Sequence, residues 1–216
     1  MRGVQFGNYH TSDDWNLILN AMKINPPTPK TTKVSVEGRD GDLNLSRALT
    51  GEMRYSNRDA SFTFLLTDGT HAEREALSMD IVSLIHGEEL KIITPDRPDF
   101  YLFGECKIED IVNNKSYLTI VISADCEPYY YAINETIREV TVTGSSQEVA
   151  IVNHGRKTIT PVIHIEGNIT LKFGSSSVSL SSGDYQLPTL LLKMGVTLVN
   201  VSGSGTVKFT YREAVL

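Results

Sequence analysis

The sequence has few of the residues on which metal centres, disulfide frameworks and membrane spans depend. Its 216 residues include two cysteines, and no apolar run approaches the roughly 18 residues needed to cross a bilayer. The cysteines form neither a CxxC motif nor a Cys/His cluster, so the sequence predicts no structural zinc site. No apolar signal segment follows Met1, and we therefore expect a protein that is made and kept in the cytoplasm, or released by lysis.

Positive charge is also scarce. The chain carries 20 basic and 26 acidic side chains, a formal net charge of -6. This balance argues against a general affinity for nucleic acid or for anionic membrane surfaces, both of which require clustered Lys and Arg. Residues 1–131 carry 13 basic and 20 acidic side chains, whereas residues 132–216 carry 7 and 6. The asymmetry predicts two units with different surroundings.

The two cysteines are predicted to be reduced. They lie on two segments that resemble one hairpin turning at Asn113-Asn114. Pairing about that turn places Cys106 opposite Val121 or Ile122, four or five residues short of Cys126. At roughly 3.4 Å per residue, the cysteines lie beyond the limit of about 7 Å between Cα atoms that a disulfide spans.

The sequence is instead rich in short segments where apolar and polar residues alternate, a pattern typical of β-strands. Residues 31–46 are predicted to form a hairpin, because apolar residues flank the turn signal Asp40-Gly41. The preceding segment, 25–29, contains three prolines and is predicted to be extended. It suits an arm that leaves the body of a domain. Further strands are predicted at 53–55 and 61–66.

One helix is predicted between Thr70 and Gly87. Thr70 and Glu73 have the spacing of a capping box, and Gly87 suits a left-handed C-terminal cap. The apolar stripe expected to face the core consists of Leu77, Ile81, Leu84 and Ile85.

After the helix the sequence is predicted to contain only β-structure. Two long strands are expected at 101–112 and 116–125, the second central because it is apolar on both faces. The character of the sequence changes at Tyr129-Tyr130-Tyr131, which predicts domains 1–131 and 132–216. Eight short strands are expected in the second domain, at 139–143, 148–153, 161–166, 168–173, 177–180, 183–187, 197–201 and 205–211. Glycines 144, 155, 167, 174, 183 and 203 are expected in the turns, and the pattern indicates an antiparallel β-sandwich.

No set of residues specifies a reaction. His10 beside Asp13-Asp14 lacks the spacing of a known metal or catalytic motif. Of the other histidines, His71, His86 and His164 have plain structural explanations, and His154 belongs to no recognisable motif. The adjacent carboxylate pairs point to opposite sides of a strand. The glycine-rich segment 203–206 joins two strands, whereas phosphate loops precede a helix. We expect no enzymatic activity, no metal and no cofactor.

Two sets of motifs resemble a known family. The N-terminal set comprises segments 4–11, 14–19 and 26–31, then V-x-V-x-G-x-D-G-x-L-x-L at 34–45, Ala48-Leu49-Thr50-Gly51, Tyr55 to Arg58, and Phe62 with Phe64. The C-terminal set comprises 183–188, 192–195, 203–206, 211–213 and Leu216, with a departure at 194–197 where an Asn is expected after the glycine. In order and spacing both sets resemble the distal tail proteins of siphophages, and together they bracket nearly the whole chain.

The resemblance implies a structural virion protein of the tail tip, assembled in the cytoplasm of the host bacterium. It implies a mainly β fold with an N-terminal tail-tube-like β-barrel or sandwich domain, which has one helix and an extended hairpin arm, and a C-terminal galectin-like β-sandwich that projects outward. Six copies are expected to form a hub ring around the DNA channel, with the acidic N-terminal domain lining that channel. Expected partners are the tail tube protein, a tail-associated or fibre-like protein and, in some phages, receptor-binding proteins. The residues expected to act in assembly are Pro26, Pro27, Pro29, Asp40, Gly41, Leu49, Gly51, Tyr55 and Arg58.

Three other interpretations are weighed against this one. A carbohydrate-binding module is the main alternative, since a galectin-like sandwich can bind sugar by stacking an aromatic ring on it. In the second domain the rings available are Phe173, Tyr185, Phe209 and Tyr211, whose plainer explanation is core packing. A tail-tube protein is disfavoured by the second domain, and an enzyme by the absence of a recognisable reaction centre.

Overall fold

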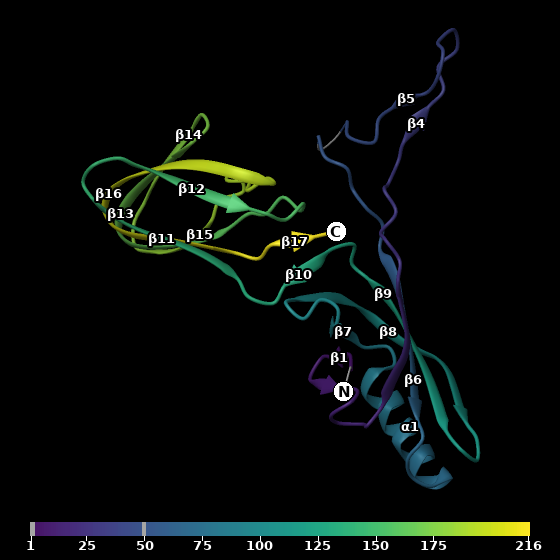
Figure 1. The fold of residues 1–216 in the computed structure, drawn as a ribbon. Coiled ribbons are helices and arrows are strands. Elements are labelled where there is room, and N and C mark those ends of the chain that lie inside the picture. Colours follow the sequence, from purple (N-terminus) through teal and green to yellow (C-terminus); the bar gives the residue numbers. More distant parts are fainter. Residues whose placement is uncertain (1–2, 49–50) are drawn as a thin grey trace. The chain divides into compact units, whose positions relative to one another are not determined.

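A computed structural model describes residues 3–48 and 51–216 (Figure 1). The chain divides into two units, Met1–Tyr130 and Tyr131–Leu216, one residue from the predicted boundary. Strands dominate both units, and one helix is present among the described residues, so the expectation of a mainly β protein with one helix is confirmed. That helix is too short and too polar to span a membrane.

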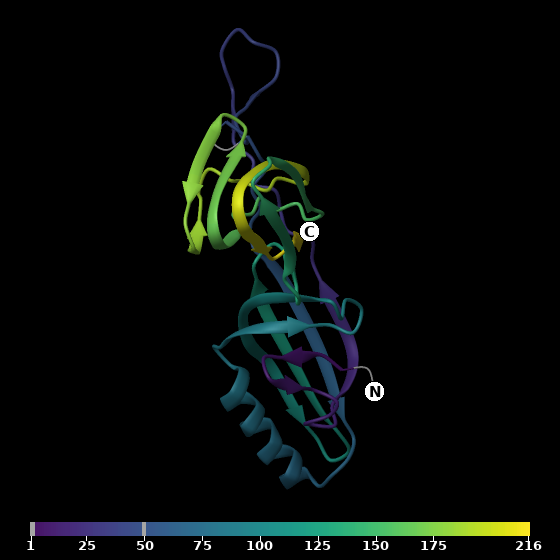
Figure 2. The ribbon, with the colours of Figure 1, turned by 90° about the vertical axis from the view of Figure 1, so that its left-hand side faces the viewer.

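The first unit is built on one antiparallel sheet (Figure 2). Its strands lie in the order β2 (Tyr9–His10), β1 (Gln5–Phe6), β7 (Glu89–Ile93), β8 (Phe100–Asn113), β9 (Leu118–Cys126), β6 (Arg58–Leu66) and β3 (Ile18–Ile24). Strand β9 pairs with β8 and β6 and is central, as predicted. One face of β9 is buried and the other is largely half-buried, because its side chains alternate between the core and the outer face.

Aromatic packing fills the core of this unit. Phe62 and Phe64 on β6 are fully buried, whereas Ser61 and Thr63, which alternate with them along the strand, face outward. The ring of Phe6 meets both phenylalanines edge to face, at centroid distances of 5.4 and 6.2 Å. Such edge-to-face pairs add to the stability gained by burial alone. The predicted alternation at 61–66 is therefore confirmed.

Helix α1 (His71–Ile85) begins as the sequence predicts. The Thr70 hydroxyl accepts a hydrogen bond from the Glu73 amide, and the Glu73 carboxylate accepts one from the Thr70 amide. Gly87 follows with φ +83°, which confirms the left-handed residue. The predicted apolar stripe is wrong in part, because Leu77 and Leu84 are only half-buried. The buried face consists of Arg74, Ser78, Ile81 and Ile85.

The predicted register of the β8–β9 hairpin is wrong. Cys106 lies opposite Ala124, two residues from Cys126, because the hairpin turns at residues 114–117, later than predicted. A bulge between Ile108 and Asp110 shifts the pairing back by one residue. Both thiols are free and buried. Burial raises the pKa of each thiol to about 12, so neither forms a reactive thiolate near neutral pH.

The second unit contains fewer and longer strands than predicted. They are β11 (Thr136–Thr143), β12 (Gln147–Asn153), β13 (Val162–Phe173), β14 (Ser176–Leu180), β15 (Gly183–Gln186), β16 (Gly195–Tyr211) and the short β17 (Ala214–Val215), and β10 (Tyr130–Ala132) spans the boundary between the units. The predicted strands 161–166 and 168–173 form one strand, and so do 197–201 and 205–211. Gly167 and Gly203 are therefore not turn residues, contrary to the prediction.

These glycines lie where β13 and β16 approach each other closely. Gly167 pairs with Gly205, and Gly203 pairs with Ile169. A Cβ atom on Gly205 would lie 1.9 Å from the Glu166 carbonyl oxygen, and one on Gly203 would lie 2.2 Å from that of Asn168. All three glycines have positive φ, so they permit both the close approach and the bend.

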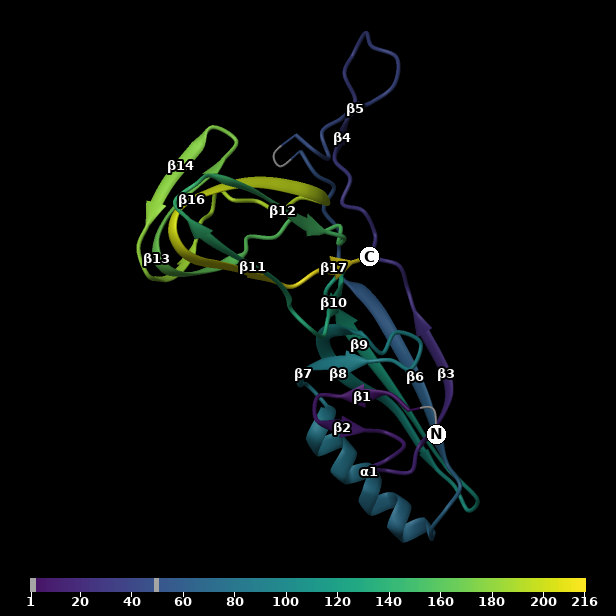
Figure 3. The same ribbon diagram turned by 60° about the vertical axis from the view of Figure 1, so that its left-hand side comes forward.

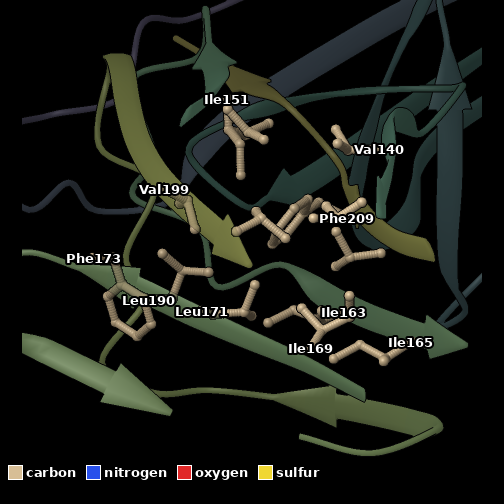
Figure 4. Packing of buried hydrophobic residues seen from close by; sticks show 14 of the residues in the cluster. Val140, Ile151, Ile163, Ile165, Ile169, Leu171, Phe173, Leu190, Val199 and Phe209 are labelled. Carbon is tan, nitrogen blue, oxygen red and sulfur yellow. The ribbon is translucent and has the colours of Figure 1, made fainter. Parts of the chain in front are cut away.

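The bend makes one sheet form two layers. The second half of β16 pairs with β11 and its first half pairs with β12, while β15 and β14 pair with the two halves of β13. Figure 4 shows side chains from both halves meeting between the layers, among them Ile163, Leu171 and Phe209. The predicted antiparallel sandwich is thus a single curled sheet around a buried core.

Candidate interaction surfaces

A long arm leaves the first unit between β3 and β6 (Figure 3). Its two legs run antiparallel: the amides of Asn25, Lys30 and Ser56 donate to the carbonyl oxygens of Asp59, Arg54 and Thr28 at 2.8–2.9 Å. Beyond them β4 (Lys33–Val34) pairs with β5 (Leu43–Asn44). The predicted extended segment and hairpin are confirmed, although each hairpin strand is only two residues long.

The arm exposes apolar and charged side chains together. Every residue from 28 to 42 is exposed, and Val34 and Val36 each expose 43% of their surface. The first leg carries Lys30 and Lys33 and has no acidic residue between Asn25 and Val36. Because water solvates valine poorly, an exposed apolar arm is typical of a segment that binds another molecule.

The residues predicted to act in assembly are distributed along this arm. Pro26, Pro27 and Pro29 lie in the first leg, Asp40 and Gly41 lie in the loop between β4 and β5, and Gly51, Tyr55 and Arg58 lie on or after the second leg, while Leu49 lies outside the described residues. The structure brings Pro29 and Tyr55 together in a β-bridge. Gly41 and Gly51 have φ values of +73° and +70°, so both positions favour glycine.

Tyr55 and Arg58 belong to a cluster at the base of the arm. The Tyr55 ring meets Tyr129 edge to face at 6.2 Å, and the Arg58 guanidinium lies 4.5 Å from the centre of the Tyr130 ring. Arg97 lies 4.3 Å from the same ring. Arg58 is 4% exposed and donates to the Pro128 carbonyl oxygen.

Burial governs the chemistry of Arg58. Loss of solvent lowers the pKa of its guanidinium, which nevertheless stays charged because arginine ionises far above neutral pH. Cation–π contact with Tyr130 offsets part of the cost of burying this charge. Arg58 therefore holds the base of the arm to its own unit. No sequence pattern linked Tyr129, Tyr130 or Arg97 to the base of the arm, because they lie about 40 to 70 residues further along the chain than Tyr55 and Arg58.

A groove of about 610 Å³ lies between helix α1 and strand β8. Its lining residues are Glu75, Ser78, Met79, Val82, Ser83, Ile111 and Asn113. Met79 is 62% exposed although methionine is usually buried. The Asn113 amide donates to Glu75 Oε2 at 2.9 Å and to the His71 carbonyl oxygen at 3.0 Å, which joins strand and helix. No sequence signal pointed to this groove.

The second unit has an apolar surface of its own. Leu191, Met194, Val196 and Leu198 are 45–67% exposed, and a hollow of about 370 Å³ includes Leu191 and Leu198 in its lining. In contrast, the rings considered for sugar stacking belong to the core: Phe173, Phe209 and Tyr211 are buried, and Tyr185 is partly buried against the same hydrophobic cluster. The carbohydrate-binding alternative therefore lacks exposed rings at the positions it named.

Histidine–carboxylate pairs occur at three places. His164 Nδ1 lies 2.6 Å from Asp184 Oδ1, and His154 Nδ1 lies 3.1 Å from Glu213 Oε1. His10 Nδ1 lies 2.9 Å from an Asp13 carboxylate oxygen, close enough for an ion pair but not aligned as a hydrogen bond. Within residues 3–48 and 51–216, no three His, Cys, Asp or Glu side chains are grouped so that they could hold a metal ion.

Comparison with known proteins identifies the fold. No protein-family model and no curated protein matches the chain. The crystal structure of the SPP1 Dit (gp 19.1) protein, described as a paradigm of the hub adsorption apparatus in phages infecting Gram-positive bacteria, aligns with a TM-score of 0.69 at 14% identity. This alignment covers 98% of this chain and 99% of that chain. The chain therefore has a Dit-like fold.

Two chains from the phage p2 baseplate in its activated conformation, with Sr and with Ca, align less well. Each is 10% identical, and the alignments cover 98% and 99% of this chain and 98% of each baseplate chain. Their TM-scores of 0.47 and 0.39 are too low to establish a shared fold.

Proposed function

We propose that this protein is a distal tail protein, a structural subunit of the ring-shaped hub at the tail tip of a long-tailed bacteriophage. The observation that carries the proposal is the alignment with SPP1 Dit, which extends over both units and the arm rather than over one domain. The family motifs at the two ends of the sequence support it independently. The role is structural, and the protein acts in the virion after assembly in the host cytoplasm.

The two units have different roles in the hub. The first, tail-tube-like unit forms a ring of six copies that joins the tail tube to a tail-associated or fibre-like protein. The second unit is a galectin-like sandwich whose exposed apolar surface suits attachment of a further protein, such as a receptor-binding protein. The arm reaches the neighbouring copy. Such a head-to-tail contact, repeated by rotation, closes a ring.

The charge of the first unit fits a channel for DNA. The unit carries 13 basic and 20 acidic side chains. A lumen of net negative potential repels phosphates, so DNA passes without binding. Mapping charges onto an experimental structure of the ring checks this, and a lumen rich in Lys and Arg would contradict it.

Native mass spectrometry and electron microscopy of the full chain test the ring directly. We expect particles of six copies with a central channel. Replacing Asp40 by Ala together with Gly41 by Val should lower the fraction of rings, since valine disfavours the positive φ of Gly41. The matched control replaces Ser145 and Ser146, which lie in an exposed hairpin loop of the second unit, by the same two residues. Rings that persist in the arm variant would count against a role of the arm in assembly.

A further inference from the structure

The chain contains two Asp-Gly pairs, Asp40-Gly41 and Asp68-Gly69, and both are exposed. In such a pair the backbone nitrogen of the glycine can attack the carboxyl carbon of the aspartate side chain, because glycine has no Cβ atom to obstruct the approach. The reaction requires these two atoms to come into close, aligned contact. Whether the fold permits that geometry therefore determines whether the pair reacts.

The pair Asp40-Gly41 is held by few interactions. It lies in the loop 35–42 between β4 and β5, where the Arg39 amide donates to the Val36 carbonyl oxygen at 3.2 Å. The Asp40 side chain has no hydrogen-bond or ion-pair partner among residues 3–48 and 51–216. Gly41 has φ +73°, and a Cβ atom built on it would have no atom within 4 Å. The Asp40 carboxyl group is therefore free to turn toward the Gly41 nitrogen.

The pair Asp68-Gly69 is fixed on both sides of its peptide bond. The Asn16 side-chain amide donates to Asp68 Oδ2 at 2.9 Å, and Arg74 Nη1 donates to the Gly69 carbonyl oxygen at 2.6 Å. Thr70, the next residue, begins the capping box of helix α1. For the carboxyl carbon to reach the Gly69 nitrogen, the bond to Asn16 must break and Gly69 must move against Arg74. The second pair is as exposed as the first, but it is not free to rearrange.

We propose that Asp40-Gly41 is a site of spontaneous covalent modification, at which aspartate is converted to isoaspartate, and that the fold protects Asp68-Gly69 from the same reaction. A bond forms between the Gly41 nitrogen and Asp40 Cγ while a bond from Cγ to a carboxyl oxygen breaks. The nitrogen loses its hydrogen and the carboxyl group loses a hydroxyl, and together they leave as water. The product is a cyclic succinimide.

Water then opens the succinimide ring. Cleavage between the nitrogen and Cγ restores aspartate, whereas cleavage between the nitrogen and the main-chain carbonyl carbon of Asp40 gives isoaspartate. The main chain then runs through Cβ and Cγ, so the loop gains one methylene group and keeps its carboxylate. Because the reaction depends only on the local geometry of each pair, this inference is independent of the proposed function.

The two pairs can be compared within one sample of the full chain. After incubation in mildly acidic buffer, a protease specific for glutamate releases Asp40 in the fragment 38–52 and Asp68 in the fragment 53–73. Mass spectrometry with electron-transfer fragmentation distinguishes isoaspartate from aspartate in each fragment. A parallel incubation in urea measures both rates in the unfolded chain, which removes any difference due to the neighbouring residues.

Folding should slow the modification of Asp68 at least about tenfold and leave that of Asp40 within about threefold of its rate in the unfolded chain. In the control variant Asp40→Glu the product should disappear from fragment 38–52, because glutamate must close a larger ring, and should be unchanged in fragment 53–73. Folding that slows both sites equally would overturn the inference. Isoaspartate that persists in fragment 38–52 of the variant would also overturn it, since the product would then belong to Asp42.

Discussion

The glycines where β13 and β16 approach each other closely show that the absence of a side chain can determine how a sheet bends. At Gly205 both the φ of +143° and the 1.9 Å approach of a Cβ atom to the Glu166 oxygen oppose any other residue. The bend they permit lets one sheet close over its own core. Two independent effects, steric overlap and an unfavourable φ, therefore act at one position.

Gly205→Ala should lower the free energy of unfolding by at least about 2 kcal/mol, because β13 and β16 must separate to admit the methyl group. Gly174→Ala is the control: its φ is +54°, and no atom lies within 4 Å of the added Cβ. The control should cost about 1 kcal/mol, the strain of the left-handed conformation alone. Urea denaturation followed by circular dichroism measures both, and equal losses would show that the close approach does not matter.

His164 supplies a pH-dependent contact on an exposed face. The hydrogen bond to Asp184 raises the pKa of the imidazole above its ordinary 6.5, and Glu166 acts in the same direction. Since the folded-state pKa is raised, the contact stabilises the fold below about pH 6.5, and this contribution is lost as the pH rises through the higher pKa. NMR titration of the ring protons should show the raised pKa, and Asp184→Asn should lower it. An unchanged pKa in this variant would refute the assigned cause.

At the scale of the element, helix α1 depends on a residue that its apolar pattern did not reveal. The Arg74 guanidinium donates to the carbonyl oxygens of Gly69, Asn114 and Lys115 and to the Asn113 side chain, at 2.6–3.3 Å. These bonds fasten the helix to the turn between β8 and β9. They also satisfy a buried charge, which would otherwise be costly.

Arg74→Lys should lower the stability of the first unit by about 2 kcal/mol, because an ammonium group cannot reproduce the planar, five-donor geometry. Arg39→Lys, at an exposed position of the arm, should have no measurable effect. Hydrogen exchange of the helix amides locates the change, and equal protection in the two variants would refute the fastening role of Arg74.

At the scale of the whole molecule, each unit has its own hydrophobic core. Phe6, Phe62 and Phe64 centre one, and Ile163 and Phe209 belong to the other. We therefore expect two unfolding transitions in differential scanning calorimetry. Gly205→Ala should shift one transition and Arg74→Lys the other. Both transitions moving together in either variant would show that the two units unfold as one.

The sequence by itself determined the features that depend on residues close together in the chain. Alternation predicted the strands and the mainly β class, the Thr70–Glu73 spacing predicted the start of the helix, and the prolines with Asp40-Gly41 predicted the arm. Each depends on interactions within a few residues, so a local pattern is sufficient. Half of the candidate site, the arm, was therefore predictable.

Tertiary structure decided everything that joins distant segments. A turn that lies later than predicted, offset by one residue at the bulge beside Glu109, sets the pairing of Cys106. Gly167 and Gly203, which were predicted to lie in turns, lie at bends within two long strands. The groove, the other half of the site, exists only because Met79 on a helix comes to lie beside Ile111 on a strand. Register and burial follow from packing across the chain, which no local pattern encodes.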